Sequence, residues 1–349
     1  MKTIVRHRLF WPSVALLALI AINTIARPQF ILVTVRNGEL YGALIDILRN
    51  SAPLMLVALG MTIVIATRGI DLSVGAIMAV SGAVALTIID GSSDPGGLGT
   101  VLVALAVALA VALVLGVWNG FLVAVVGIQP IIATLVLMLA GRGVALLITE
   151  GFITTVNSEP YEFIATGYLV ALPFAFLIAV AAIAVVSLIE RRTALGMLTE
   201  AVGINPEASR LAGVRARGIV FSAYVASGLL AGIAGIIYSS NIRAADANAA
   251  GLFIELYAIL AVVLGGTSLM GGKFTIAGTV IGVLIIQTLE ATILFLGVPS
   301  AQSPVFFAIV VIVVVLVQSP RLHSWARTAI RSARARTSAD AGARAGVAS

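Results

Sequence analysis

Apolar residues dominate the chain in long runs that short polar segments separate. A membrane-spanning helix needs about 20 predominantly apolar residues, and ten runs reach or approach that length. The pattern therefore predicts an all-α integral membrane protein with ten transmembrane helices. The predicted spans cover roughly residues 10–26, 44–67, 74–90, 99–119, 128–149, 168–189, 218–240, 252–270, 275–297 and 304–319.

The longest polar break in this pattern extends from Glu190 to Gly218 and carries five arginines and three glutamates. A first short helix is predicted over residues 195–202 and ends at Gly203. A helix too short to span a bilayer, placed in a basic loop between two spans, is typical of a docking element for a cytoplasmic partner. The alternative is a solvated loop that only follows the bias of cytoplasmic loops toward Lys and Arg.

A second short helix in the same break has a well-formed start. Asn205 occupies the N-cap position, Pro206 the first helical position, and Glu207 the first turn. These residue types are the ones favoured at those positions. We expect this helix to end near Gly213.

Composition indicates that lipid is the main solvent of this chain. Of its 349 residues, 60% are hydrophobic and only 10% are charged, with a mean hydropathy of +1.15, whereas soluble domains carry about 25% charged residues. The net charge of +6 comes from arginines at the ends of apolar runs and in the tail, which does not indicate nucleic-acid binding. The chain has no cysteine, and its two histidines, His7 and His323, lie outside the apolar runs. We therefore expect no metal site, and an intramembrane hydrolase is disfavoured.

Basic residues are shared unevenly between the two sides that ten spans define. Most of the 21 Lys and Arg residues fall on the side that holds both termini and the 190–218 break, while the opposite loops carry carboxylates. This asymmetry predicts cytoplasmic termini and a cytoplasmic break. The first run follows Lys2, Arg6 and Arg8 as a signal peptide would, but it is long and no clean cleavage site follows. We interpret it as the first span.

Two charged residues fall inside predicted spans, where an Arg costs about 2.5–3.5 kcal/mol on insertion scales. Arg142 either snorkels toward the external interface or lines a path with a carboxylate partner. Glu290 is protonated, paired with Arg142 or another donor, or exposed to a wet cavity. Neutral groups that can contact hydroxyls bracket the turn between the fourth and fifth spans. The expected translocation path therefore comprises Asn119, Gln129, Thr134, Arg142 and Glu290.

Glycines recur at two kinds of position. Gly228, Gly232 and Gly235 lie on one helix face and predict close helix packing. Two heptads, residues 69–75 and 266–272, share the frame Gly-x-x-Leu-x-x-Gly on the predicted cytoplasmic side. Such a match can indicate an internal repeat, although it does not align the turns that an inverted repeat would pair. The motif residues are Gly69, Asp71, Ser73, Gly75, Gly265, Gly266, Gly271 and Gly272.

Asp71 and Ser73 stand just before the helix expected to start near Val74. Both residue types are favoured N-caps, so we predict that they cap this helix.

The sequence lacks the motif of a nucleotide site. Lys273 follows Gly272, but Thr267 replaces the first glycine of the phosphate-binding loop and Phe274 replaces its Ser or Thr. We expect no ATP-binding site in this chain. Nor does any span carry the carboxylate and histidine series of a proton relay or the repeated arginines of a voltage sensor.

Four stretches together resemble the permease subunits of ribose-type bacterial sugar ABC importers. They read GMTIVIATRGIDLSVGAIMAVSGA (60–83), WNGFLVAVVGIQPIIATLVLMLAGRG (118–143), TALGMLTEAVGINPEASRLAGV (193–214) and AILAVVLGGTSLMGGKFTIAGTVIG (258–282). The likeness covers about residues 37–320, and residues 38–76 and 241–263 favour the galactofuranose branch over the ribose branch. Arg68 departs from the small residue expected before the first heptad, and the Arg-rich tail lies outside the family pattern.

The resemblance implies an inner-membrane permease that imports a monosaccharide and performs no covalent chemistry. It implies a tandem-domain ATPase that binds ATP and Mg on the cytoplasmic side, a periplasmic sugar-binding protein, and a second permease in a homodimer or heterodimer. The 190–217 loop would dock on the ATPase through the coupling residues Asn205, Glu207, Ala208, Arg210, Leu211 and Gly213. The alternative from another class is a stand-alone ion-coupled carrier that uses Glu290 and Arg142.

The chain divides by composition into a transmembrane permease domain over residues 1–320 and an Arg- and Ala-rich tail over residues 321–349. The tail is predicted to be a solvated, disordered cytoplasmic segment, which can also contact anionic lipid.

Overall fold

The computed structural model describes residues 9–297, 305, 308–309 and 312. One compact unit ends at Thr292 and a second begins at Ile293. The architecture below is that of the first unit. Most of the predicted tenth span and the whole 321–349 tail lie outside the described residues.

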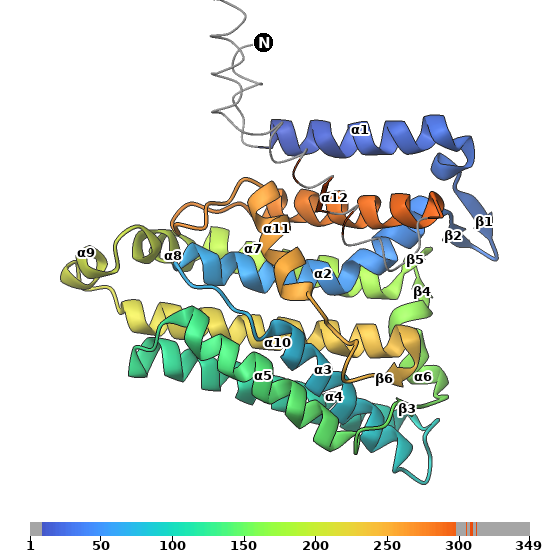
Figure 1. Ribbon diagram of the computed structural model, residues 1–349, viewed down its shortest axis with the longest axis horizontal. Helices are drawn as coiled ribbons and strands as arrows, with labels where there is room; N and C mark the ends of the chain where they lie inside the picture. The colour runs from blue at the N-terminus through green and yellow to red at the C-terminus, as the bar shows by residue number, and fades with distance from the viewer. Residues whose placement is uncertain (1–8, 298–304, 306–307, 310–311, 313–349) are drawn as a thin grey trace, which may run out of the picture. The chain divides into compact units, whose positions relative to one another are not determined.

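The described chain is built almost entirely of helices (Figure 1). They are α1 (Phe10–Ala26), α2 (Ala43–Ala66), α3 (Val74–Asp90), α4 (Leu98–Gly120), α5 (Pro130–Ile148), α6 (Glu159–Thr166), α7 (Phe174–Arg192), α8 (Leu195–Ile204), α9 (Pro206–Leu211), α10 (Ala216–Ile242), α11 (Ile254–Leu264) and α12 (Ile276–Phe295). A 3₁₀ turn follows α1 (η1, Pro28–Ile31) and a π-helical turn extends α4 (η2, Phe121–Val126).

Six of these helices are long and apolar enough to cross a membrane: α2, α4 with η2, α5, α7, α10 and α12. The shorter apolar helices α1, α3, α8 and α11 have 10–17 residues. The predicted spans therefore coincide with helices over most of the described chain. Two predicted boundaries are wrong, in the sixth and eighth spans.

The sixth span was predicted from residue 168, but α7 begins at Phe174. Residues 168–173 form a small hairpin in which Val170 and Ala171 have positive φ angles. The eighth span was predicted over 252–270, but α11 ends at Leu264 and an irregular segment follows. Gly266 there has a φ of +86°, which is outside the helical region.

The core of this unit forms around α10, which packs against α2, α3 and α4. Glycine makes these approaches possible. A Cβ on Gly228 would lie 2.6 Å from the Cα atom of Gly116 in α4, and one on Gly235 would lie 2.2 Å from the carbonyl oxygen of Met78 in α3. The predicted glycine face is thus confirmed as a close helix–helix contact.

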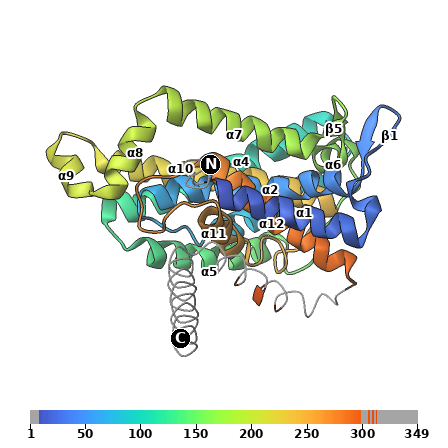
Figure 2. The same cartoon turned by 90° about the horizontal axis from the view of Figure 1, so that it is seen from above.

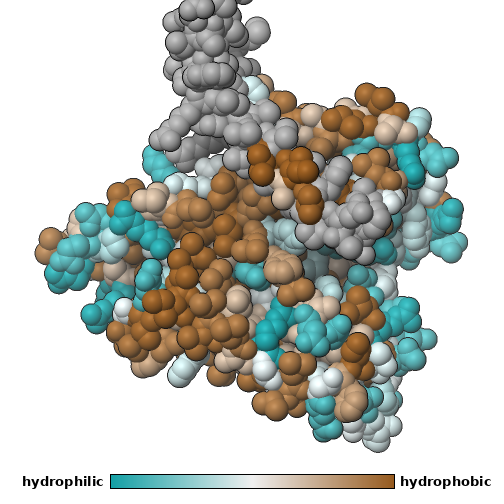
Figure 3. Space-filling model, in the orientation of Figure 1, coloured by the Kyte–Doolittle hydropathy of each residue, from teal (hydrophilic) through white to brown (hydrophobic). Residues whose placement is uncertain are grey.

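Short strands gather at one end of the unit, opposite to α9, and both views agree on this (Figures 1 and 2). The antiparallel pairs are β1 (Thr34–Arg36) with β2 (Glu39–Tyr41), β3 (Thr154–Thr155) with β6 (Ala244–Ala245), and β4 (Tyr168–Leu169) with β5 (Leu172–Pro173). Hydrophilic residues lie at both ends, and hydrophobic residues cover most of the face between them (Figure 3).

Candidate functional site

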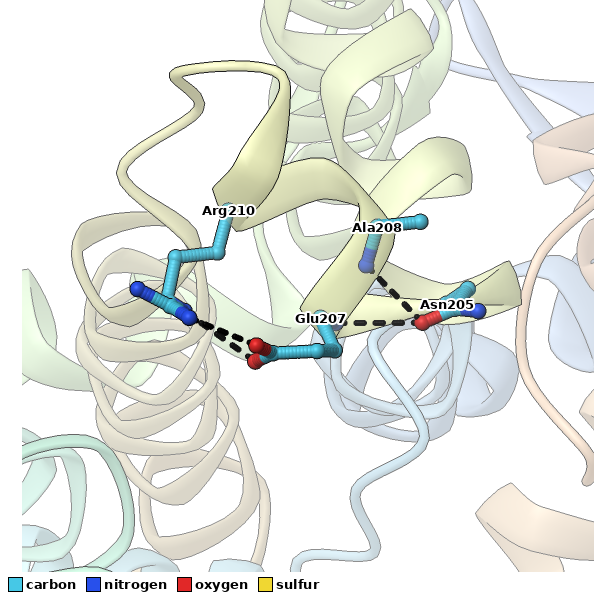
Figure 4. A network of polar contacts seen from close by, with 4 residues as sticks. All are labelled: Asn205, Glu207, Ala208 and Arg210. Carbon is cyan, nitrogen blue, oxygen red and sulfur yellow. Dashed lines mark hydrogen bonds and ion pairs between the residues drawn. The ribbon is translucent and has the colours of Figure 1, made fainter.

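The helix α9 is held by a local capping structure whose start the sequence predicts. The Asn205 side chain accepts hydrogen bonds from the backbone N–H groups of Glu207 (3.1 Å) and Ala208 (3.0 Å). Figure 4 shows this cap together with the ion pair that follows it. Arg210 donates to both carboxylate oxygens of Glu207, at 3.1 and 2.6 Å. The bonds from Arg210 and its positive charge lower the pKa of Glu207, so this pair stays ionised at neutral pH.

The remaining surface of α9 is exposed and partly apolar. Leu211 is 76% exposed, and Glu207, Ala208 and Arg210 are exposed around it. Gly213 follows with a φ of +86°, and a Cβ there would meet nothing within 4 Å. Glycine is therefore needed at this position for its backbone conformation rather than for space. An exposed, charged helix with an apolar tip is suited to contact another protein.

The preceding helix, α8, is fixed tightly to the interior. A Cβ on Gly203 would lie 1.8 Å from the carbonyl oxygen of Ala66 and 2.5 Å from the backbone nitrogen of Gly272. That nitrogen in turn donates to the Ala66 carbonyl over 2.9 Å. The end of α8, the end of α2 and the 266–272 heptad thus meet at one point.

Arg68, which stands where the sequence pattern predicts a small residue, contacts this junction. Its Nε donates to the carbonyl of Met270 over 3.0 Å, and its φ angle is +68°. A Cβ on Gly271 would lie 2.3 Å from the Cγ atom of Arg68. The start of the first heptad, residues 69–75, therefore adjoins the second heptad, residues 266–272, through Arg68, whereas Gly75 at its end packs against Gly251 in the segment between β6 and α11.

The prediction that Asp71 and Ser73 cap α3 is wrong for Ser73, which makes no side-chain cap hydrogen bond at the N-terminus of α3. Asp71 does make a local bond of the capping type, because its Oδ1 accepts from the backbone N–H of Ser73 (3.0 Å), two residues on and directly before the helix. The same oxygen accepts from the Ser73 hydroxyl (2.6 Å), and Oδ2 accepts from the hydroxyl of Ser227 in α10 (2.8 Å). Asp71 thus combines a local bond with a tertiary one.

Asn119 and Thr134, predicted to line a path, also serve this buried region. Nδ2 of Asn119 donates to the Ser73 hydroxyl over 2.7 Å, and the Thr134 hydroxyl contacts the carbonyl of Ile70 at 3.3 Å. Both side chains are 0% exposed. Gln129, in contrast, is exposed at the N-terminus of α5.

Arg142 binds backbone carbonyls and does not pair with Glu290. It donates to the backbone carbonyls of Ala247 (3.0 Å) and Ala250, in the segment between β6 and α11. Glu290 accepts a hydrogen bond from Gln287 one turn earlier in α12 (3.0 Å) and is exposed. Of the alternatives for Glu290, pairing with Arg142 is not seen, whereas Gln287 supplies another donor. The two predicted charged residues are therefore not partners.

Comparison with protein-family models identifies the family of this chain. Residues 43–315 match the family described as the permease component of the branched-chain amino acid transport system. The chain belongs to this permease family.

Relatives of this permease include sugar permeases, each of which aligns with it over most of its length. The chain is 49% identical to the galactofuranose transporter permease protein of Escherichia coli K12 over 325 residues, which are 91% of this chain and 93% of that protein. It is 43% identical to the fructose import permease protein of Bifidobacterium longum, over 93% and 91% of the two chains. It is 38% identical to the ribose import permease protein of Escherichia coli K12, over 88% and 92%. No solved structure matches this permease.

Six candidate spans and the family assignment make this permease a multi-pass protein of the bacterial inner membrane. The family is a transport component. Within the described ranges, no group of three or more His, Cys, Asp or Glu residues could hold a metal ion.

Two contacts important to the site were not predicted from the sequence. Ser227 completes the bonding of Asp71. Gly203, which was expected only to end a helix, seats α8 against α2. Neither contact has a local signal in the sequence, because each joins segments that are distant along the chain.

Proposed function

We propose that this permease is the membrane-spanning subunit of an ATP-driven importer for a monosaccharide, with galactofuranose the favoured sugar. The observation that carries this proposal is the 49% identity to a galactofuranose transporter permease over 91% of the chain. The fructose and ribose relatives are less similar, at 43% and 38% identity. Their substrates are also monosaccharides, so they support the same substrate class. Ribose and other simple sugars are the alternative substrates.

The end of the unit that carries α8 and α9 is proposed to face the cytoplasm. Among the described residues, this end holds Arg68, Arg191, Arg192, Arg210, Arg215, Arg217 and Lys273. Loops of bacterial membrane proteins that are rich in Lys and Arg stay inside. The strand end carries Asp90, Asp94, Glu150, Glu159, Glu162 and Asp246, and it is the proposed contact surface for a periplasmic sugar-binding protein.

A separate tandem-domain ATPase is the proposed source of energy, and it would bind the ATP and Mg. Its docking surface on this permease is α9, through Glu207, Ala208, Arg210 and Leu211, with Asn205 and Gly213 fixing the two ends of the helix. Two observations support this role. Leu211 is exposed, so a partner can reach it. The two hydrogen bonds of the Asn205 cap hold the start of α9 in place, so a force on α9 can pass to the rest of the permease. A second permease, either a copy or a sister chain, would complete the translocation path.

Glu290 remains the best candidate for the path among the five residues proposed from sequence. Glu290 is an exposed residue in the second half of α12, and an intramembrane charge is costly unless it meets water or a polar partner. Gln129 is exposed near the cytoplasmic end and fits an exit position. Asn119, Thr134 and Arg142 are committed to protein groups, so they shape the path rather than contact sugar.

Reconstitution in liposomes tests the proposal. Uptake of labelled galactofuranose should require this permease, the ATPase, the binding protein and ATP together, and unlabelled galactofuranose should compete better than ribose or fructose. Uptake by the purified permease alone under an ion gradient would instead identify a secondary carrier.

A further inference from the structure

The connection between α2 and α3, residues 67–73, lies between the docking end and the interior helices. At its start, Arg68 donates to the carbonyl of Met270 and lies against Gly271, where a Cβ would also lie 3.0 Å from the carbonyl oxygen of Gly203 in α8. Ala66, the last residue of α2, has Gly203 directly against its carbonyl. On the other side the connection reaches the interior helices through Asp71. It is therefore joined to the α8–α9 region through the end of α2 and the 266–272 heptad.

Asp71 has an unusual environment for a carboxylate. It is 0% exposed, and within the described chain no Lys or Arg forms an ion pair with it. Burying a charge without a cation is costly unless hydrogen bonds compensate. Three donors, from Ser73 and Ser227, converge on its two oxygens.

The same network extends to a third helix. Ser73 uses its hydroxyl hydrogen on Asp71 and accepts from Nδ2 of Asn119 in α4 at 2.7 Å. All four side chains are at most 1% exposed. The series Asn119–Ser73–Asp71–Ser227 thus ties the 67–73 connection to α4 on one side and to α10 on the other.

Close packing prevents the connection from moving independently of α10. A Cβ on Gly69 would lie 2.4 Å from the hydroxyl of Tyr224, one turn before Ser227 on α10. A Cβ on Gly60 would lie 2.8 Å from the Cα atom of Ser227 itself. One acceptor, Oδ1 of Asn119, is buried without a hydrogen-bond partner within the described chain, so the network has room to take another donor when the connection shifts.

We propose that Asp71 is a positioning residue that transmits displacement of the α8–α9 region to α4 and α10. The proposal rests on the importer function above. Hydrogen bonds are directional and short-ranged, so a displaced connection carries along the helices that Asp71 and Ser73 hold. Without them, α8 can still move on the ATPase, but the interior helices no longer follow.

The test compares Asp71→Asn and Ser227→Ala in liposomes that contain the ATPase and the binding protein. The readout is the ratio of ATP hydrolysed to sugar imported. Because a hydrogen bond to a charged group is a strong one, we expect the ratio to rise at least about fivefold in both variants while ATP hydrolysis is retained. A merely structural role would lower hydrolysis, uptake and yield of folded protein together, and would leave the ratio unchanged.

Ser81→Ala is the matched control, because Ser81 is also a buried serine between α3 and α10. Its hydroxyl contacts the carbonyls of Met78 and Gly232, at 3.1 and 3.0 Å, away from the 67–73 connection. This variant should keep the wild-type ratio. A wild-type ratio in both Asp71→Asn and Ser227→Ala would overturn the inference and leave the importer function standing, whereas ATP-independent uptake by the wild-type permease would overturn that function first.

Discussion

The contact of Gly203 with α2 gives a prediction whose sign can be worked out from the structure. Replacing Gly by Ala inside a helix normally stabilises it by about 1 kcal/mol. At Gly203 the added Cβ would lie 1.8 Å from the carbonyl oxygen of Ala66 and 2.5 Å from the backbone nitrogen of Gly272. Both neighbours are backbone atoms, so no side-chain rotation relieves the overlap. Overpacking of this kind costs about 1–3 kcal/mol and occasionally more.

Gly203→Ala should therefore be destabilising by about 2 kcal/mol despite its better helix propensity. The added Cβ would also press on both atoms of the hydrogen bond from Gly272 to Ala66, which is 2.9 Å long. The expected result is a fall of roughly 5 °C in the unfolding temperature of the detergent-solubilised permease. Sugar uptake should fall further than ATP hydrolysis, because the link between docking and transport is disturbed.

Gly218→Ala provides the control, since Gly218 also lies inside a helix, α10, and a Cβ there would meet nothing within 4 Å. This variant should be neutral or slightly stabilised and should transport normally. If Gly203→Ala matched Gly218→Ala in both unfolding temperature and uptake, the proposed seat of α8 against α2 would be refuted.

Three further predictions concern the docking end and the interior. Asn205→Ala removes both cap hydrogen bonds of α9 and should cost about 1 kcal/mol of local stability, seen as faster amide hydrogen exchange over residues 206–211 and weaker uptake, whereas unchanged exchange would contradict the cap's role. Because Arg210 lowers the pKa of Glu207, the pair's contribution is complete above the unfolded pKa of about 4.3 and is lost only as the pH falls through the lower folded value. Titration of this pair should therefore cause no pH dependence of coupling between pH 6 and 8, and a pH-dependent step in that range that disappears in Glu207→Gln would refute this. Arg142→Met leaves the carbonyls of Ala247 and Ala250 without their donor and should lower the unfolding temperature, while a stability equal to wild type would show that the two bonds contribute nothing net.

Local features of the docking end could be predicted from the sequence because their causes are local. An N-cap needs only Asn205 and the N–H groups that follow it, so the start of α9 was within reach. The long spans could be located because lipid demands uninterrupted apolar length. The eighth span was overestimated because Gly265 ends α11 where it meets Gly278 of α12, and an apolar run does not reveal such a contact.

The chemistry of the interior could not be predicted because its partners are remote in the sequence. Asp71 had the residue type of a cap, but Ser227, 156 positions away, takes one of its oxygens. Arg142 suggested a carboxylate partner, yet it binds backbone carbonyls, which every residue has and no pattern marks. The residue types indicated that Asp71 and Arg142 have polar partners, and only the packed structure showed which groups those partners are.

The most direct test of the central proposal is the accessibility of α9 in the membrane. The chain contains no cysteine, so Leu211→Cys, at a position 76% exposed, would carry a single thiol. A membrane-impermeant maleimide should label it in inside-out vesicles but not in intact cells, and the bound ATPase should protect it. Labelling from outside intact cells, or labelling that the ATPase does not reduce, would contradict the account.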